Sequence, residues 1–237
     1  FIPGKPQGEE VINITVPQIN AARCDGCGAC VEACQFNALA LIAEVPMLFG
    51  ELCHGCGCCA LVCPQLAIGE RASRIGVVKT WQSGQILLKG GCLDVGVSSA
   101  STLVHAVKER LVPGMDAILD APRGTACQAV ATLRGVDYAV LVTEPTPFGL
   151  HDLRLAVDTA RELGVKFGVV INRSDIGDAR VHDYCTQENI PVLLEIPEDR
   201  RIAEAYSRGE LLIDALPQYR ADFQRLWQAI ARQEIGA

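Results

Sequence analysis

Nine of the twelve cysteines fall between Cys24 and Cys63, and this density constrains the fold more than any other feature of the sequence. The first run reads CDGCGACVEAC and begins at Cys24. The second reads CHGCGCCALVCP and begins at Cys53. Cysteines packed this closely are poorly spaced for separate disulfides, and the start, FIPGKPQGEE, has none of the features of a secretion signal. Metal binding in a reducing cytoplasm is therefore expected.

Each run repeats the spacing C-x2-C-x2-C-x3-C. In two-cluster ferredoxins, three cysteines of such a run ligate one iron–sulfur cubane and the fourth reaches the other cluster. We therefore expect two [4Fe–4S] clusters whose ligands are exchanged between the runs. The first cluster is assigned to Cys24, Cys27, Cys30 and Cys63, and the second to Cys53, Cys56, Cys59 and Cys34.

Structural zinc is the alternative, because paired C-x2-C units also suit zinc. A zinc site does not require a third cysteine at the next three-residue step and a fourth four residues later, so clusters are favoured. Cys58 falls at the position of Ala29 in the first run and is expected to be a spare thiol. His54 is either a group that couples protons to electrons or an exposed loop residue.

Composition narrows the partners. The formal net charge is −7 and no Lys- or Arg-rich run is present, which argues against nucleic acid as a main partner. The longest apolar stretch, ALALIAEVPMLFG, contains Glu44 and Pro46 and is too short to span a bilayer, so membrane insertion is not expected.

Beyond the cysteine runs, apolar segments of strand length alternate with segments of helical periodicity. This alternation predicts a parallel sheet in a three-layer α/β domain. The expected strands are IGVVKTW, QILLK, DAILDAP, DYAVLVTEP, KFGVVINR and PVLLEIP, and the expected helices include SASTLVHAVKERL, LHDLRLAVDTAREL and ARVHDYCTQEN.

Ligands of such sheets bind beyond the carboxyl ends of the strands, where three residues are of interest. Asp120 closes an expected strand and is either a carboxylate that holds a magnesium-bound water or a turn residue. Asn172 ends another strand and can pair with a purine edge or serve in a plain turn. The backbone after Pro197 can line a base pocket.

Together, DAPRGTAC, LVTEPTPFGLHDLRLAV, FGVVINR and EIPEDRRIAEAYSRG resemble the MinD/ParA-type deviant P-loop ATPases, in the subgroup with an inserted two-cluster ferredoxin domain. The resemblance implies a P-loop NTPase-like α/β fold that binds ATP and Mg²⁺. It implies that Asp120 acts on magnesium through water, that Gly124 lies near the γ-phosphate and that Asn172 reads the adenine. It also implies a homodimer or a pair with a homologous ATPase.

The family's phosphate loop, KGGxGK[ST], is missing from the sequence. Gly4-Lys5 is followed by Pro6, and LKGGCLDVG has no Gly-Lys-Ser/Thr after its KGG. Because the chain also lacks an initiator Met, we expect the P-loop segment to precede Phe1. The expected domains are residues 1–18 as a remnant of the α/β domain, 19–72 as the ferredoxin-like insert and 73–237 as the rest of the ATPase domain.

The expected function is an iron–sulfur ATPase that couples ATP binding or hydrolysis to electron transfer or to assembly of a metal cofactor or cluster. The alternative is a ferredoxin-type electron carrier whose α/β domain only docks partners. Either function requires a redox partner protein. Cys127, just past Asp120, is either a buried thiol or a metal-bridging ligand across a dimer axis.

Overall fold

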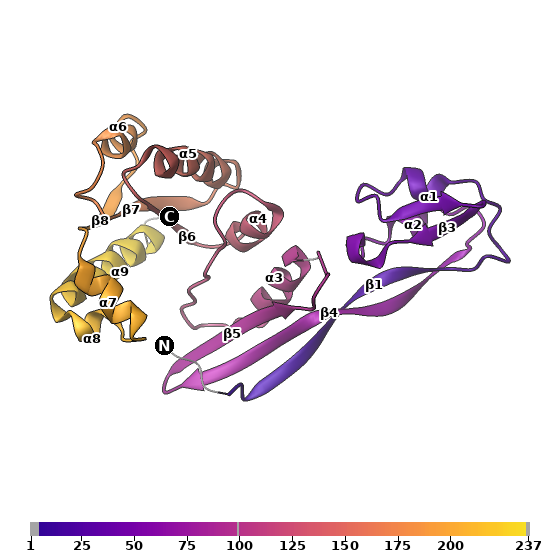
Figure 1. Ribbon diagram of the computed structural model, residues 1–237, viewed down its shortest axis with the longest axis horizontal. Coiled ribbons are helices and arrows are strands. Elements are labelled where there is room, and N and C mark those ends of the chain that lie inside the picture. The colour runs from indigo at the N-terminus through magenta and orange to yellow at the C-terminus, as the bar shows by residue number, and fades with distance from the viewer. Residues whose placement is uncertain (1–4, 99, 236–237) are drawn as a thin grey trace. The chain divides into compact units, whose positions relative to one another are not determined.

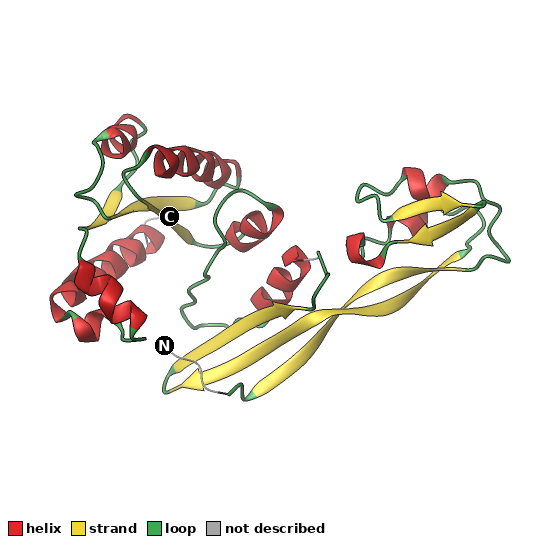
Figure 2. Cartoon of the chain, in the orientation of Figure 1, coloured by secondary structure: helices red, strands yellow, loops and turns green. Residues whose placement is uncertain are grey.

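The computed structural model describes residues 5–98 and 100–235, which divide into two compact units between Ile118 and Leu119. The fold is of mixed α/β type, with antiparallel sheets in the first unit and a parallel sheet in the second (Figures 1 and 2). None of the helices in the described ranges has the length and apolar character that crossing a membrane requires.

A long antiparallel sheet runs through the first unit in the order β1-β4-β5. The strands are β1 (Gly8–Ile19), β4 (Ile68–Ser83) and β5 (Ile86–Leu93). β1 and β4 pair along their length, from Gly8 opposite Thr80 to Ile19 opposite Ile68, and form the long twisted ribbon in Figure 1. The chain thus enters and leaves the cysteine-rich region through two paired strands.

The cysteine-rich region is a small module between β1 and β4. It contains two short helices, one hairpin and a 3-10 turn. In chain order the elements are α1 (Ala29–Glu32), β2 (Leu39–Ile42), β3 (Val45–Leu48), the 3-10 turn η1 (Gly50–Leu52) and α2 (Cys58–Leu61).

One apolar core joins this module to the rest of the first unit. Helix α3 (Ala100–Lys108) places Leu103 and Ala106 against Ile75 and Val78 of β4. The same cluster of buried residues continues through β1 to Ala38 and Cys53 in the module; its β1 members are Ile12, Ile14 and Val16. The module is therefore packed onto the sheet as well as connected to it.

The placement of β4 and β5 corrects the sequence analysis. These strands were expected in the parallel sheet, but they pair antiparallel with each other, and Ser83 lies opposite Ile86. The two residues left for the turn, Gly84 and Gln85, cannot make the long crossover that parallel neighbours need. The expected domain boundary after residue 72 also falls inside β4.

The second unit holds a three-stranded parallel sheet in the order β6-β7-β8. Helices α5 and α6 cover one face, where their apolar residues surround Val169 and Ile171 of β7, and α9 lies on the other side (Figure 1). The elements are α4 (Cys127–Leu133), β6 (Tyr138–Thr143), α5 (Pro147–Glu162), β7 (Lys166–Asn172), α6 (Arg180–Gln187), β8 (Val192–Ile196), α7 (Arg200–Ser207), α8 (Leu212–Ala215), η2 (Pro217–Tyr219) and α9 (Arg220–Ile235).

The expected strand DAILDAP is not formed. Residues 116–122 have neither helix nor strand structure, and the side chain of Ile118 is 88% exposed. A strand requires a neighbour for its backbone hydrogen bonds, and none of the described strands pairs with this segment. Asp120 therefore does not close a strand here.

Candidate metal centre

The module consists of two copies of one local structure, offset by 29 residues, since Cys24 corresponds to Cys53. In each copy a glycine in the left-handed region, Gly28 at φ 77° or Gly57 at φ 73°, precedes a four-residue helix. The copies are tied together by matching backbone bonds, from Asn20 N–H to the Ala67 carbonyl and from Phe49 N–H to the Ala38 carbonyl, both at 2.8 Å.

The first cavity of the module is lined by four cysteines: Cys24, Cys27 and Cys30 from the first run and Cys63 from the second. Cys30 is buried, Cys27 is exposed and the other two are half-buried. The fourth cysteine of the second run thus reaches across to the first, which is the exchange that the spacing suggested.

The second cavity has the reciprocal composition, with Cys53, Cys56 and Cys59 from the second run and Cys34 from the first. Cys58, which was expected to be a spare thiol and not a ligand, lines this cavity as well. Cys58 is the first residue of α2, directly after Gly57. The cavity is therefore bordered by five cysteines.

The two exchanged cysteines have the same local surroundings. The backbone N–H of Ala38 donates to the Sγ of Cys34, and that of Ala67 donates to the Sγ of Cys63, each at 3.3 Å. Such bonds to sulfur fix the side chain and stabilise the negative charge of a thiolate.

Burial acts against the charged form of two central cysteines. It raises the pKa of the Cys30 thiol, and the neighbouring Cys24 and Cys63 raise it further. It likewise raises the pKa of Cys59, next to Cys53 and Cys56. Grouped thiolates repel one another, so the thiols deprotonate together only when a cation binds among them. This chemistry suits an iron–sulfur cluster, whose irons bind thiolates.

The two cavities differ in the pair of side chains beside the cysteines. At the first cavity, Gln65 Nε2 donates to Asp25 Oδ2 at 3.0 Å. This bond and the N–H of Cys27 lower the pKa of Asp25. At the second cavity, the rings of Phe36 and His54 stack with centroids 4.0 Å apart and an interplanar angle of 16°. The sequence analysis singled out only His54 among these four residues.

The expected nucleotide residues lie in the second unit, where the structure brings two of the four together. Asn172 ends β7 and pairs in register with Ile196 of β8, the residue before Pro197, so both lie at the carboxyl edge of the parallel sheet. Asp120 and Gly124 lie in an exposed segment that has no helix or strand and extends to the start of α4. Cys127, the first residue of α4, is exposed.

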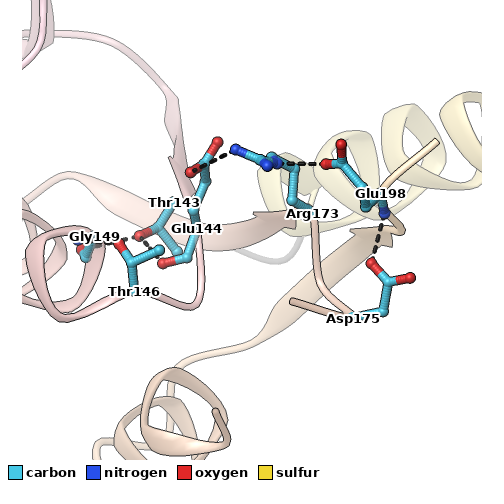
Figure 3. A network of polar contacts seen from close by, with 7 residues as sticks. All are labelled: Thr143, Glu144, Thr146, Gly149, Arg173, Asp175 and Glu198. Atoms are coloured by element: carbon cyan, nitrogen blue, oxygen red, sulfur yellow. Dashed lines mark hydrogen bonds and ion pairs between the residues drawn. The ribbon is translucent and has the colours of Figure 1, made fainter. Parts of the chain in front are cut away.

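A polar network that the sequence analysis missed lies at the same edge of the sheet (Figure 3). Arg173, with φ 53°, forms ion pairs with Glu144, at 3.7 Å, and with Glu198. The backbone N–H of Glu198 donates to Asp175 Oδ1 at 2.6 Å. The network links the carboxyl ends of all three strands. The network joins residues at the ends of three strands that are distant in sequence. It could have been expected only if the order of the strands in the sheet had been known.

Comparison with known proteins agrees with the cysteine geometry. The family described as 4Fe-4S binding domain matches residues 17–40, which include the whole first run. The chain thus contains a ferredoxin-type domain of the kind that binds a [4Fe–4S] cluster.

Two relatives come from Methanocaldococcus jannaschii. Uncharacterized protein MJ0578 is 30% identical over 194 residues, which cover 80% of this chain and 67% of the relative. The chain belongs to the family of MJ0578. Uncharacterized protein MJ0579 is 36% identical over 93 residues, which cover 39% of this chain and 31% of the relative. The chain therefore spans less than a third of MJ0579.

Proposed function

We propose that the module binds two [4Fe–4S] clusters and passes electrons between a donor and an acceptor protein. The observation that carries the proposal is the reciprocal exchange of Cys34 and Cys63 between the two cavities. When bound, such clusters accept and donate single electrons. Four cysteines at one cavity would also satisfy zinc, but a zinc site does not require the third cysteine at a further three-residue step that both runs contain.

The surroundings of the cavities also support clusters. Gly26 and Gly55 have φ values of 72° and 68°, and a Cβ at either position would lie within 3 Å of a backbone oxygen. The loops therefore turn tightly around the cavities because glycine is present. Ala38 and Ala67 direct N–H groups to the two exchanged thiolates. These donors favour a net negative cluster over an empty site.

Analysis of anaerobically purified protein tests this proposal directly. We expect about eight iron and eight sulfide per chain, as two cubanes require, and an electron paramagnetic resonance signal after reduction with dithionite. Stoichiometric zinc without iron would exclude the proposed function. If only one cluster per chain is found, the protein is still an iron–sulfur protein, but one of the two cavities does not bind a cluster.

A second proposal follows from the α/β unit: in the complete protein, ATP and Mg²⁺ bind at the carboxyl edge of the parallel sheet and control the transfer. Its support is the position of Asn172 beside Pro197, where an amide and an adjacent backbone can hold a purine. The resemblance to MinD/ParA-type ATPases gives Asp120 the magnesium role and Gly124 a place near the γ-phosphate. The 237 residues contain no phosphate loop, and the proposal therefore assigns this loop to a segment outside them.

The complete protein with its phosphate loop decides between coupling and simple docking. Electron transfer from the reduced clusters is measured with ATP, with ADP and with neither. Coupling predicts different rates in the three cases and loss of the difference in Asp120→Asn. Suppose instead that Asp120→Asn abolishes hydrolysis while the rate never depends on nucleotide. The α/β unit then only docks partners, as in the simpler electron carrier.

The proposal extends to the assembly and its location. The resemblance to dimeric ATPases suggests a homodimer or a pair with a homologous ATPase, and in either arrangement a redox partner protein is required. A cytoplasmic location fits free thiols that must bind metal. Sedimentation analysis of the anaerobic protein with and without ATP tests the dimer, which nucleotide should stabilise.

A further inference from the structure

The 29-residue offset of the module places different side chains at equivalent positions of the two cavities. Asp25 follows Cys24 at the first cavity, and His54 follows Cys53 at the second. In the same way, Gln65 of the first cavity corresponds to Phe36 of the second. A hydrogen-bonded carboxylate–amide pair at one cavity is thus replaced by an aromatic stack at the other.

The carboxylate of Asp25 is fixed beside the first cavity. Its Oδ2 accepts from Gln65 Nε2 at 3.0 Å and its Oδ1 accepts from the N–H of Cys27 at 3.2 Å. A reduced cluster carries one more negative charge than an oxidised one, so a nearby carboxylate disfavours reduction. Arg23 opposes this effect weakly, because its exposed guanidinium bonds to the Gln65 carbonyl and is absent from the cavity lining.

Asp25 has a second effect that involves the backbone. By accepting from the N–H of Cys27, it occupies a donor that could otherwise bond to a cluster sulfur. At the second cavity, the equivalent N–H of Cys56 has no partner among the described residues and remains available to sulfur. Hydrogen bonds to the sulfurs raise the reduction potential of a cluster, so the loss of one lowers it.

The second cavity has a carboxylate of its own, Glu70, but this group is held differently. Glu70 lies on β4, its side chain is exposed, and it has no hydrogen-bonding or ionic partner in the described part of the chain. Asp25 is exposed as well, so the two carboxylates differ in how they are held: two hydrogen bonds keep the charge of Asp25 beside the cysteines, and none does so for Glu70 in the described part of the chain. The aromatic stack covers the cavity only in part, because Phe36 is 41% exposed.

We infer that Asp25 gives the cluster bound by Cys24, Cys27, Cys30 and Cys63 the lower reduction potential of the two. An electron that enters the module then resides mainly on the cluster beside Phe36 and His54. This inference rests on the proposed function, since it requires both cavities to be filled.

A redox titration of the holo-protein, followed by electron paramagnetic resonance, tests the inference. The wild type should show two one-electron steps at least tenfold apart in equilibrium constant, about 59 mV. Asp25→Asn removes the charge and keeps an oxygen for the Cys27 N–H, so it should raise only the lower step. Asp25→Ala also releases that N–H and should raise the lower step further.

The mirror substitutions at the second cavity provide the control. His54→Asp should lower only the upper step and narrow the gap, and it should do so more than the uncharged His54→Asn, which loses the same aromatic stack. Glu70→Gln should move the upper step less than Asp25→Asn moves the lower one. If an Asp25 variant does not retain two clusters, the comparison of the two His54 variants decides.

Three results would overturn the inference: coincident steps in the wild type, an equal shift of both steps in Asp25→Asn, or equal effects of His54→Asp and His54→Asn. Iron and sulfide analysis of each sample separates these results from failure of the proposed function. A wild type without two clusters contradicts the proposed function, whereas two clusters with coincident steps contradict only the inference about Asp25.

Discussion

The backbone N–H of Ala67 donates to the Sγ of Cys63, four residues before it in the chain, at 3.3 Å. Between them Leu66 adopts φ 47°, and the equivalent Asn37 in the first run adopts φ 52°. In each run the left-handed residue closes a turn in which the following N–H bonds to the fourth cysteine. The same local turn thus accompanies both cysteines, Cys34 and Cys63, that line the cavity of the other run.

Serine substitutions should separate the ligands from the spare thiol. Cys34→Ser should damage the cluster of the second cavity and Cys63→Ser that of the first, because each removes the ligand that the other run supplies. Cys58→Ser should retain both clusters, even though Cys58 lines the second cavity. Iron content and the reduced-state spectrum measure all three. Loss of a cluster in Cys58→Ser would show that the ligand assignment is wrong.

Alanine at the loop glycines should weaken cluster binding in a graded way. At Gly26 a Cβ would lie 2.8 Å from the Glu44 carbonyl oxygen, and at Gly55 it would lie 2.9 Å from that of Thr15. At Gly28 it would meet nothing within 4 Å. Each alanine pays about 1–2 kcal/mol for the left-handed conformation, and the first two also force the backbone to move.

The rate of iron loss to a ferrous chelator measures this effect. Gly26→Ala and Gly55→Ala should lose iron faster than Gly28→Ala, which should in turn lose it faster than the wild type. Equal rates in all three variants would mean that the close backbone approach at Gly26 and Gly55 does not matter to the loops.

The parallel sheet should be sensitive at Ile171. This side chain is fully buried in β7 between α5 and α6, so Ile171→Ala should lower the free energy of unfolding of the second unit by about 2–5 kcal/mol. Val142→Ala on β6 is the matched control, because Val142 is 67% exposed and should cost no more than about 0.5 kcal/mol. Urea unfolding followed by circular dichroism measures both, and equal costs would contradict the packing of this sheet.

The contribution of Asp199 to the stability of the folded state should not depend on pH near neutrality. Its carboxylate caps α7, and the hydrogen bond from Arg201 lowers its pKa from 3.8 to about 2. A carboxyl group with a lowered pKa stabilises the folded state at every pH above its ordinary pKa of 3.8. This contribution is lost as the pH falls from 3.8 toward 2. Between about pH 5.5 and pH 8 the carboxylate is ionised throughout, so its contribution is constant.

Thermal unfolding of Asp199→Asn measures this contribution. The variant should melt below the wild type, because it loses the ion pair with Arg201, and the difference should be the same at both ends of that pH range. A difference that shrinks between pH 8 and pH 5.5 would show that the carboxylate titrates far above its expected range.

The cysteine spacing assigned four cysteines to each cluster, and the same four line one cavity each, with Cys58 in addition at the second. A run of fixed spacing wraps a local loop whatever surrounds it. The strand IGVVKTW was also recognised, but its apolar residues do not say whether its neighbours run parallel or antiparallel. The two residues between the strands, Gly84 and Gln85, are too few for a parallel connection and therefore indicate an antiparallel hairpin. DAILDAP failed for a related reason, since apolar residues form a strand only where another strand offers hydrogen bonds.

The contacts around the site depended on pairs that are distant in sequence. Gln65 is far along the chain from Asp25, and Arg173 is far from Glu144, so composition and helix or strand periodicity do not indicate these contacts. The 29-residue repeat indicates only that the Asp25–Gln65 and His54–Phe36 pairs occupy equivalent positions. It aligns the positions beside the cysteines before any coordinates are known.

The paired strands at the neck of the module have a consequence for how the protein acquires its clusters. Ile19 lies opposite Ile68, so residues 20–67 form a loop whose ends are already joined. Closing a loop has an entropic cost that rises only slowly with loop length, and the pairing of β1 with β4 already offsets this cost. Binding of iron and sulfide therefore does not have to bring the two ends of the module together. We therefore expect a module that has lost its proposed clusters to keep this strand pairing and to bind iron and sulfide again without refolding of the β1–β4 sheet.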